Sequence, residues 1–187
     1  MQFFLPLFSI VATFVLFLCS LLLNELIFTK SEFVRGINWI YLPAGMRLLC
    51  LLIFGGWGAI GILLASWVVG FTYYFPEPEH FSRAFVGGII SAVAPYLVYK
   101  LAQYQFGLAS SLANLTARRL LICILAYAFA GPFFYHLFFV IQGTTDKLLI
   151  SFMAMFMGDL LGTLIIVYAF KIILFWWAPD RTRSKKI

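Results

Sequence analysis

Charged residues are scarce along this chain. Only 11% of its 187 residues are Asp, Glu, Lys or Arg, whereas 64% are hydrophobic and the mean hydropathy is +1.01. A soluble domain ordinarily carries about 25% charged residues, so this sequence cannot cover a water-facing surface. In lipid, backbone polar groups must be satisfied within the spanning segment, which helices achieve. We therefore expect an all-α integral membrane protein surrounded by a lipid bilayer.

The sequence also lacks the patterns that carry catalysis or bind metals. Histidine occurs twice and cysteine three times, and no two cysteines form a CxxC pair. Neither a disulfide framework nor a metal site is predicted. The HExxH, GxSxG and Walker patterns are missing as well. We expect a protein that is not an enzyme, and the sequence identifies no cofactor.

The net charge of +6 comes partly from a basic cluster that directly follows the last apolar run. A cluster in this position is typical of a cytoplasmic anchor that also touches anionic lipid, and nucleic acid is not the expected partner. We predict one transmembrane domain over residues 1–178 and a basic cytoplasmic tail over 179–187. The cluster consists of Arg181, Arg183, Lys185 and Lys186.

Long apolar runs account for most of the chain. A helix that crosses the hydrocarbon needs about 20 apolar residues, so about six spans with short loops use the whole length. Gly55-Gly56-Trp57-Gly58 indicates a tight turn that joins the second and third spans into a hairpin. The sequence predicts a bundle of about six transmembrane helices, over residues 3–28, 43–54, the glycine turn to 74, 85–101, 118–141 and 148–177.

The distribution of Lys and Arg predicts the orientation. Six spans place both termini on one side, together with Lys100, Arg118, Arg119 and the basic tail. Basic residues on the other side are diluted by acidic ones. Because cytoplasmic loops carry an excess of Lys and Arg, we expect a multi-pass protein of the bacterial inner membrane with both termini in the cytoplasm.

Two charged residues inside apolar runs are the first candidates for function. A charge at mid-bilayer costs at least about 2.5–3.5 kcal/mol, so such residues ordinarily have a role. Arg47 lies one turn into the second span and either snorkels to the interface or faces inward. Asp159 is too short to snorkel and should face the bundle interior, for binding, for conformational coupling or as a hydrogen-bonded structural residue. Their depths permit an Arg47–Asp159 pair.

Glu25 and His136 are further candidates for this intramembrane polar cluster. Glu25 closes the first span and is either an ordinary interfacial carboxylate or a third member of the cluster. His136 lies within the fifth span. A lone histidine there is more often a hydrogen-bonded structural residue than a haem or metal ligand, and His80 lies in a loop.

Two short motifs together resemble a known family. The first runs from Trp39 through Pro43 and Gly45 to Arg47, and the second is Gly158-Asp159-Leu160-Leu161-Gly162. Gly158 and Gly162 line one helix face, which permits close approach of another backbone. The motifs resemble the membrane-associated sensor (MASE-type) domain, the multi-span amino-terminal half of bacterial histidine kinases and diguanylate cyclases. The resemblance implies a sensory role, without defining a ligand.

The sequence departs from that family in one respect. The family carries a kinase or cyclase domain after the last span, whereas this chain ends about ten residues beyond Trp177. We therefore expect a stand-alone, non-enzymatic sensor or interaction module that acts through a membrane or cytoplasmic partner protein, or through a second copy. The alternatives are a small-molecule-binding membrane subunit of a vitamin-type importer, or an accessory subunit of a membrane complex.

Overall fold

The protein is a bundle of apolar helices. The computed structural model describes residues 4–108, 112, 114–143 and 147–177; the predicted basic tail over 179–187 lies outside them. These residues contain five helices that are long and apolar enough to cross a membrane. The helices are α1 (Phe4–Phe28), α2 (Leu42–Val69), α3 (Phe81–Phe106), α4 (Ala117–Ile141) and α5 (Leu148–Trp177).

The outer surface of the bundle is apolar. Large hydrophobic side chains are exposed on every helix, as at Leu26 with 79% of its surface accessible, and at Phe85, Leu137 and Ile173. Water-soluble monomers rarely expose contiguous apolar patches of more than a few hundred Å². This exterior suits contact with lipid, as the composition predicts.

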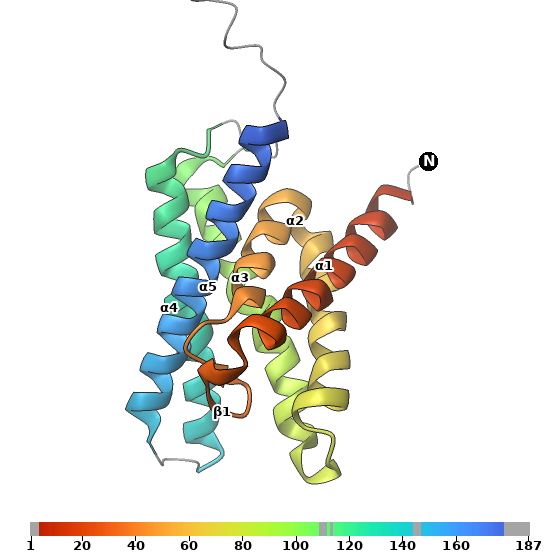
Figure 1. Cartoon of the computed structure of the whole chain (residues 1–187), viewed down its shortest axis with the longest axis vertical. Coiled ribbons are helices and arrows are strands. Elements are labelled where there is room, and N and C mark those ends of the chain that lie inside the picture. The colour runs from red at the N-terminus through yellow and green to blue at the C-terminus, as the bar shows by residue number, and fades with distance from the viewer. Residues whose placement is uncertain (1–3, 109–111, 113, 144–146, 178–187) are drawn as a thin grey trace, which may run out of the picture.

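The prediction of six separate helices is not confirmed, because residues 42–69 form a single kinked helix, α2. The predicted glycine turn is nevertheless present as a kink inside it. Gly55 has φ 57° and ψ −133°, and two helical segments meet there. A Cβ atom on Gly58 would lie 2.7 Å from the carbonyl oxygen of Cys50. Residues eight apart in a straight helix are separated by about 12 Å, so the chain folds back at this point (Figure 1).

Length explains why the first part of α2 is not a full span. At ~1.5 Å per residue, residues 42–54 cover about 20 Å, which is short of the ~30 Å of hydrocarbon. Most of its side chains are instead buried, and Leu48 and Leu51 are inaccessible to solvent. An apolar run in the sequence thus marks a short helical segment enclosed by the bundle.

A small β-hairpin lies where a loop was expected. Strands β1 (Glu32–Val34) and β2 (Ile37–Asn38) pair antiparallel, and Gly36 makes the turn with φ +84°. Figure 1 shows the hairpin at one end of the bundle and the N-terminus, with the end of α5, toward the other. The same end as the hairpin carries the π-helical turn Gly70–Tyr74, the 3₁₀ turn Pro78–His80, the end of α4 and the start of α5.

Helix α2 is the centre of the bundle, since it contacts α1, α3 and α5 extensively. Its first turn is held by α1: the amide of Leu42 donates to Asn24 Oδ1 at 2.8 Å, and Asn24 is buried. Pro43 follows, where its missing N–H breaks no helical hydrogen bond. Three core clusters include residues of α2: Leu48 and Leu52 with Val98, Ala102, Ile124 and Tyr127; Ala65 and Val69 with Phe17 and Leu21; and Leu51 and Ile62 with Ala92.

Candidate functional site

Arg47 lies inside the bundle, with 8% of its surface accessible. Its Nη2 donates to the hydroxyl of Tyr41 at 3.3 Å, while its Nε has no hydrogen-bond partner. The guanidinium carbon lies 5.0 Å from the ring centroid of Phe17 and 5.3 Å from that of Tyr41, both within cation–π range. Of the two interpretations drawn from sequence, this position corresponds to the inward-facing one.

Tyr41 is a hydrogen-bond partner of Arg47 and immediately precedes α2. Burial raises the pKa of the Tyr41 hydroxyl above its ordinary value, although the Arg47 guanidinium acts in the opposite direction. Tyr41 therefore accepts the hydrogen bond from Arg47 as a neutral phenol. Consequently this hydrogen bond leaves the positive charge of Arg47 without neutralisation.

Asp159 lies on α5 and is 4% accessible. Its Oδ2 lies 2.9 Å from the position that a Cβ atom on Gly131 would take, so the carboxyl group sits against the glycine of α4. Asp159 and Arg47 are close enough to interact electrostatically, and Tyr127 lies near both. Both residues are described, and the structure shows no direct ion pair between them. The two ionisable side chains share one buried region without forming an ion pair.

The two sequence motifs meet in the folded chain. The amide of Tyr41 donates to the carbonyl oxygen of Gly158 at 3.1 Å. A Cβ atom on Gly162 would overlap the Tyr41 carbonyl oxygen, and one on Gly45 would lie 2.8 Å from the Cα of Thr163. Glycine is required at these positions because two backbones approach where a side chain would otherwise stand.

The remaining motif residues frame this contact. Trp39 is partly exposed and packs edge-on against Phe33, with ring centroids 6.0 Å apart. Pro43 is fully buried in the first turn of α2. A Cβ atom on Gly158 would overlap the carbonyl oxygen of Asn38. The segment before α2, residues 38–41, therefore packs directly against α5.

Glu25 lies beside this region without bonding to Arg47. Its Oε2 accepts a hydrogen bond from the hydroxyl of Tyr73 at 3.1 Å. The carboxylate is partly exposed and lies near the surface at the hairpin end. Its neighbour Asn24, which caps α2, is the more deeply placed of the two.

His136 occupies an aromatic environment. Its Nδ1 lies 2.8 Å from the carbonyl oxygen of Pro132, and its ring packs edge-on against Phe139 and Phe152 at 5.4 and 5.3 Å. Its neighbours are thus different from those of Arg47 and Asp159. Among the described residues, no group of three or more His, Cys, Asp or Glu side chains could hold a metal ion.

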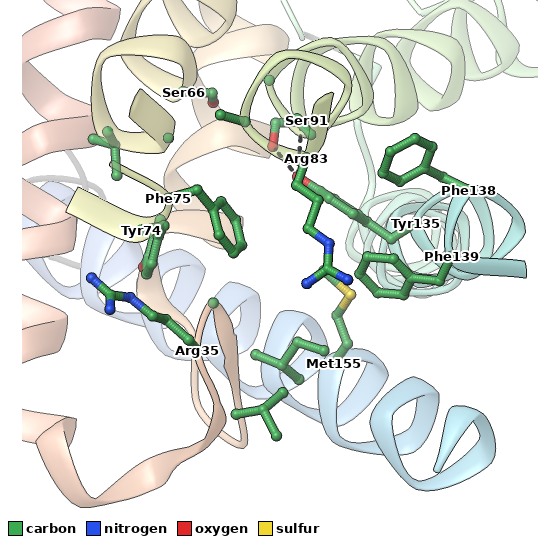
Figure 2. Close-up of a pocket in the computed structure, with 18 of the residues that line it drawn as sticks. Arg35, Ser66, Tyr74, Phe75, Arg83, Ser91, Tyr135, Phe138, Phe139 and Met155 are labelled. Atoms are coloured by element: carbon green, nitrogen blue, oxygen red, sulfur yellow. Dashed lines mark hydrogen bonds between the residues drawn. The ribbon is translucent and has the colours of Figure 1, made fainter. Parts of the chain in front are cut away.

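A cavity of about 710 Å³ extends from Arg47 toward the hairpin end of the bundle. Its wall includes residues of all five helices and of the β-hairpin. Figure 2 shows Tyr135, Phe138 and Phe139 of α4 on one side and Tyr74 and Phe75 on another. The lining combines aromatic rings with a few polar groups, as ligand pockets in proteins ordinarily do.

Tyr135 and Ser91 form a hydrogen-bonded pair on this wall. The Tyr135 hydroxyl donates to the carbonyl oxygen of Gly87 at 2.7 Å and lies 2.8 Å from Ser91 Oγ, which therefore donates to it (Figure 2). Ser66, on the second segment of α2, also lines the cavity, and its buried Oγ has no hydrogen-bond partner. The buried hydroxyl of Tyr74, which lines the cavity as well, also lacks a partner.

Positive charge predominates in the cavity lining. Arg35, Arg83 and Lys147 join Arg47, whereas Glu77 is the one carboxylate among the described lining residues. Arg35 donates to the carbonyl oxygen of Tyr73 at 2.7 Å. Figure 2 shows Arg83 extending from α3 toward Met155 of α5.

Sequence reasoning missed the tyrosines of α4 and Ser66. One signal could have found the tyrosines: Tyr127, Gly131 and Tyr135 are spaced four apart, so they share one helix face. That face meets Asp159 at Gly131 and the cavity at Tyr135. Ser66 has no comparable signal, because a single hydroxyl in an apolar run is common in membrane helices.

Comparison with known proteins adds no relative. No protein-family model, curated protein or solved structure matches the chain.

Proposed function

We propose that this chain is a non-enzymatic, membrane-embedded binding module of the bacterial inner membrane, which senses a small molecule and acts through a partner protein. The observation that carries the proposal is the cavity of about 710 Å³ with Arg47 on its wall. Ligand pockets ordinarily enclose about 300–1,000 Å³. Protein interiors are otherwise close-packed, so an internal space of this size favours a binding role.

The contact between α2 and α5 supports a route from the cavity to a partner. Ser151 and Met155 of α5 line the cavity, and Gly158 and Gly162 follow one and two turns later against the segment before α2. Beyond residue 163, α5 is largely exposed. If α5 can adopt two placements relative to α2, a ligand that binds one of them more tightly shifts the population toward it. A partner protein in contact with the exposed part of α5 would then detect this shift.

The resemblance to membrane-associated sensor domains agrees with this proposal. The residues that carry it, from Trp39 to Arg47 and from Gly158 to Gly162, form one contact instead of two unrelated segments. Close backbone approach of this kind needs glycine at fixed positions. The resemblance thus has a physical counterpart in the proposed signal route.

Purification with mass spectrometry tests the proposal. The full chain is purified in mild detergent, and co-purified small molecules and proteins are identified. We expect a near-stoichiometric organic compound with wild type and much less with Ser151→Phe, which fills the cavity. Ile150→Phe is the matched control, since Ile150 neighbours Ser151 but is 51% exposed. Equal amounts of compound in wild type and Ser151→Phe, or none in wild type, would contradict the proposal.

A vitamin-type importer subunit is the second candidate. The observation that favours it is the cavity direction: Arg35, Glu77 and Lys147 line the cavity at the hairpin end, away from the N-terminus and the end of α5 (Figure 1). With both termini in the cytoplasm, that end would face outward and receive a ligand from outside. Co-purified ATPase subunits and uptake of the compound by cells would favour transport, whereas a co-purified kinase or cyclase would favour sensing.

The orientation has its own test. Green fluorescent protein fused to the C-terminus should fluoresce, since it folds in the cytoplasm, and alkaline phosphatase at the same position should be inactive. The same reporters placed after Lys147 should give the reverse result. Active phosphatase at the C-terminus would contradict the cytoplasmic placement of the termini.

A further inference from the structure

We infer that the cavity is built for an anionic amphiphile, a molecule that carries a carboxylate or phosphate group on an apolar body. The inference rests on the proposed binding function and adds the chemical class of the ligand. Three features of the lining carry it: buried polar atoms without a hydrogen-bond partner, among them Arg47 Nε, an excess of positive charge, and apolar walls.

Three buried polar atoms of described lining residues lack hydrogen-bond partners. They are Arg47 Nε, Ser66 Oγ and the hydroxyl of Tyr74. Buried polar atoms in proteins are hydrogen-bonded in the great majority of cases. Each of them can donate a hydrogen bond and needs an acceptor, such as an oxygen atom of a ligand. All three residues line the cavity that would hold the ligand.

The charge of Arg47 indicates that this oxygen belongs to an anion. The contacts of Arg47 with Phe17 and Tyr41 are to aromatic rings and a neutral phenol, and Asp159 does not touch it. A guanidinium group matches the paired oxygens of a carboxylate or phosphate with two parallel hydrogen bonds. An alcohol or amide could accept one such bond without neutralising the charge.

The charged residues that line the outer part of the cavity are also mostly positive. Arg35 and Lys147 outnumber Glu77, and the bond of Arg35 to a carbonyl oxygen leaves its charge in place. A cleft lined by one sign of charge concentrates molecules of the opposite sign. An anion approaching from the hairpin end would therefore be attracted along the whole path to Arg47.

The apolar walls define the rest of the ligand. Phe138 and Phe139 of α4 and Met155 of α5 line one part of the cavity (Figure 2), and Phe17 lines it beside Arg47. Methionine adapts its shape to different apolar partners. These walls suit an alkyl chain or a ring system attached to the anionic group. The same chemistry occurs in free amphiphilic metabolites and in the lipids of the membrane.

Binding of simple probes tests the inference. The full chain is placed in nanodiscs of zwitterionic phosphatidylcholine and titrated with radiolabelled dodecyl phosphate, with empty discs subtracted. Dodecanol and dodecyltrimethylammonium carry the same chain with no charge and with a positive charge. We expect saturable binding of dodecyl phosphate that is at least about tenfold tighter than that of either counterpart.

Variants assign the effect to the named groups. Arg47→Gln should weaken dodecyl phosphate binding roughly ten- to hundredfold, which corresponds to the loss of a charged hydrogen bond, and Arg47→Lys should retain part of it. Ser66→Ala should weaken it a few-fold and leave dodecanol unchanged; this variant keeps the charge and shape of the core. Arg118→Gln is the control, since Arg118 is exposed at the start of α4.

The outcomes separate this inference from the proposed function. Equal binding of dodecanol and dodecyl phosphate, or no saturable dodecyl phosphate binding, overturns the anionic assignment. Dodecanol binding that Ser151→Phe abolishes would leave the binding function intact. Repeating the titration in discs that contain phosphatidylglycerol identifies the source. Competition by this lipid supports a lipid headgroup as the natural ligand, and unchanged binding supports a free metabolite.

Discussion

The amide of Tyr41 donates to the carbonyl oxygen of Gly158 at 3.1 Å, which joins the segment before α2 to the middle of α5. A backbone hydrogen bond from a loop to a helix carbonyl requires the loop to lie directly on the helix surface. Gly158 and Gly162 permit this approach because each presents only backbone on that face. The contact fixes Tyr41, the hydrogen-bond partner of Arg47, relative to α5.

Gly162→Ala should destabilise the protein by about 1–3 kcal/mol, the usual effect of forcing extra atoms into a filled interior. The added Cβ would overlap the carbonyl oxygen of Tyr41, and a backbone atom cannot rotate away. The measurement is thermal unfolding in detergent, followed by tryptophan fluorescence. Gly56→Ala is the control, because its Cβ would meet nothing closer than 4.0 Å. Equal melting temperatures for the two variants would contradict this account of the α2–α5 contact.

Much of the architecture follows from the apolar runs. The predicted limits of the last two spans, 118–141 and 148–177, agree closely with α4 (Ala117–Ile141) and α5 (Leu148–Trp177), because polar turns bound them. The second predicted span is not confirmed as a separate helix, because residues 42–54 form the first segment of α2 before the kink at Gly55. This segment is too short to cross the hydrocarbon alone. Hydropathy measures how apolar a segment is, and it does not distinguish lipid contact from burial in protein.

The candidate site could be located only in part. Arg47 and Asp159 stand out because charge is rare in apolar runs, and the structure buries both. Their surroundings depend on contacts between residues far apart in sequence, such as Phe17 and Arg47. The cavity exists because the five helices, when packed together, leave part of the space between them unfilled. No periodicity within a single helix encodes it.

Gly55→Ala should destabilise the protein by about 1–3 kcal/mol. The backbone at this position has φ 57° and ψ −133°, a conformation that residues other than glycine rarely adopt. The hydroxyl of Tyr99 would also lie 3.2 Å from the new Cβ. Chemical denaturation in mixed micelles measures the loss. The adjacent Gly56→Ala again provides the comparison, and a Gly55→Ala variant as stable as Gly56→Ala would show that the fold does not need this kink.

Asn24→Ala should cost about 1–2 kcal/mol, because it leaves the buried amide of Leu42 without an acceptor. The side chain of Asn24 also ties α1 to the first turn of α2, so the loss should appear as faster hydrogen exchange at the start of α2. Ser9→Ala in the same helix removes a hydroxyl that bonds only the carbonyl oxygen of Leu5 and should change little. Unchanged exchange at residues 42–46 in Asn24→Ala would argue against the cap.

A double-mutant cycle between Arg47 and Asp159 tests whether their charges cooperate. Asp159→Asn and Arg47→Leu are measured singly and together by equilibrium unfolding. Because the charges lie in one buried region, we expect a coupling free energy of about 0.5–3 kcal/mol despite the missing direct contact. A second cycle, Asp159→Asn with Lys100→Gln, is the control, since Lys100 is exposed on α3. Additive losses in both cycles would mean that Asp159 does not compensate the charge of Arg47. The ligand anion inferred above would then be its principal counter-charge, and bound dodecyl phosphate should stabilise wild type more than Arg47→Leu.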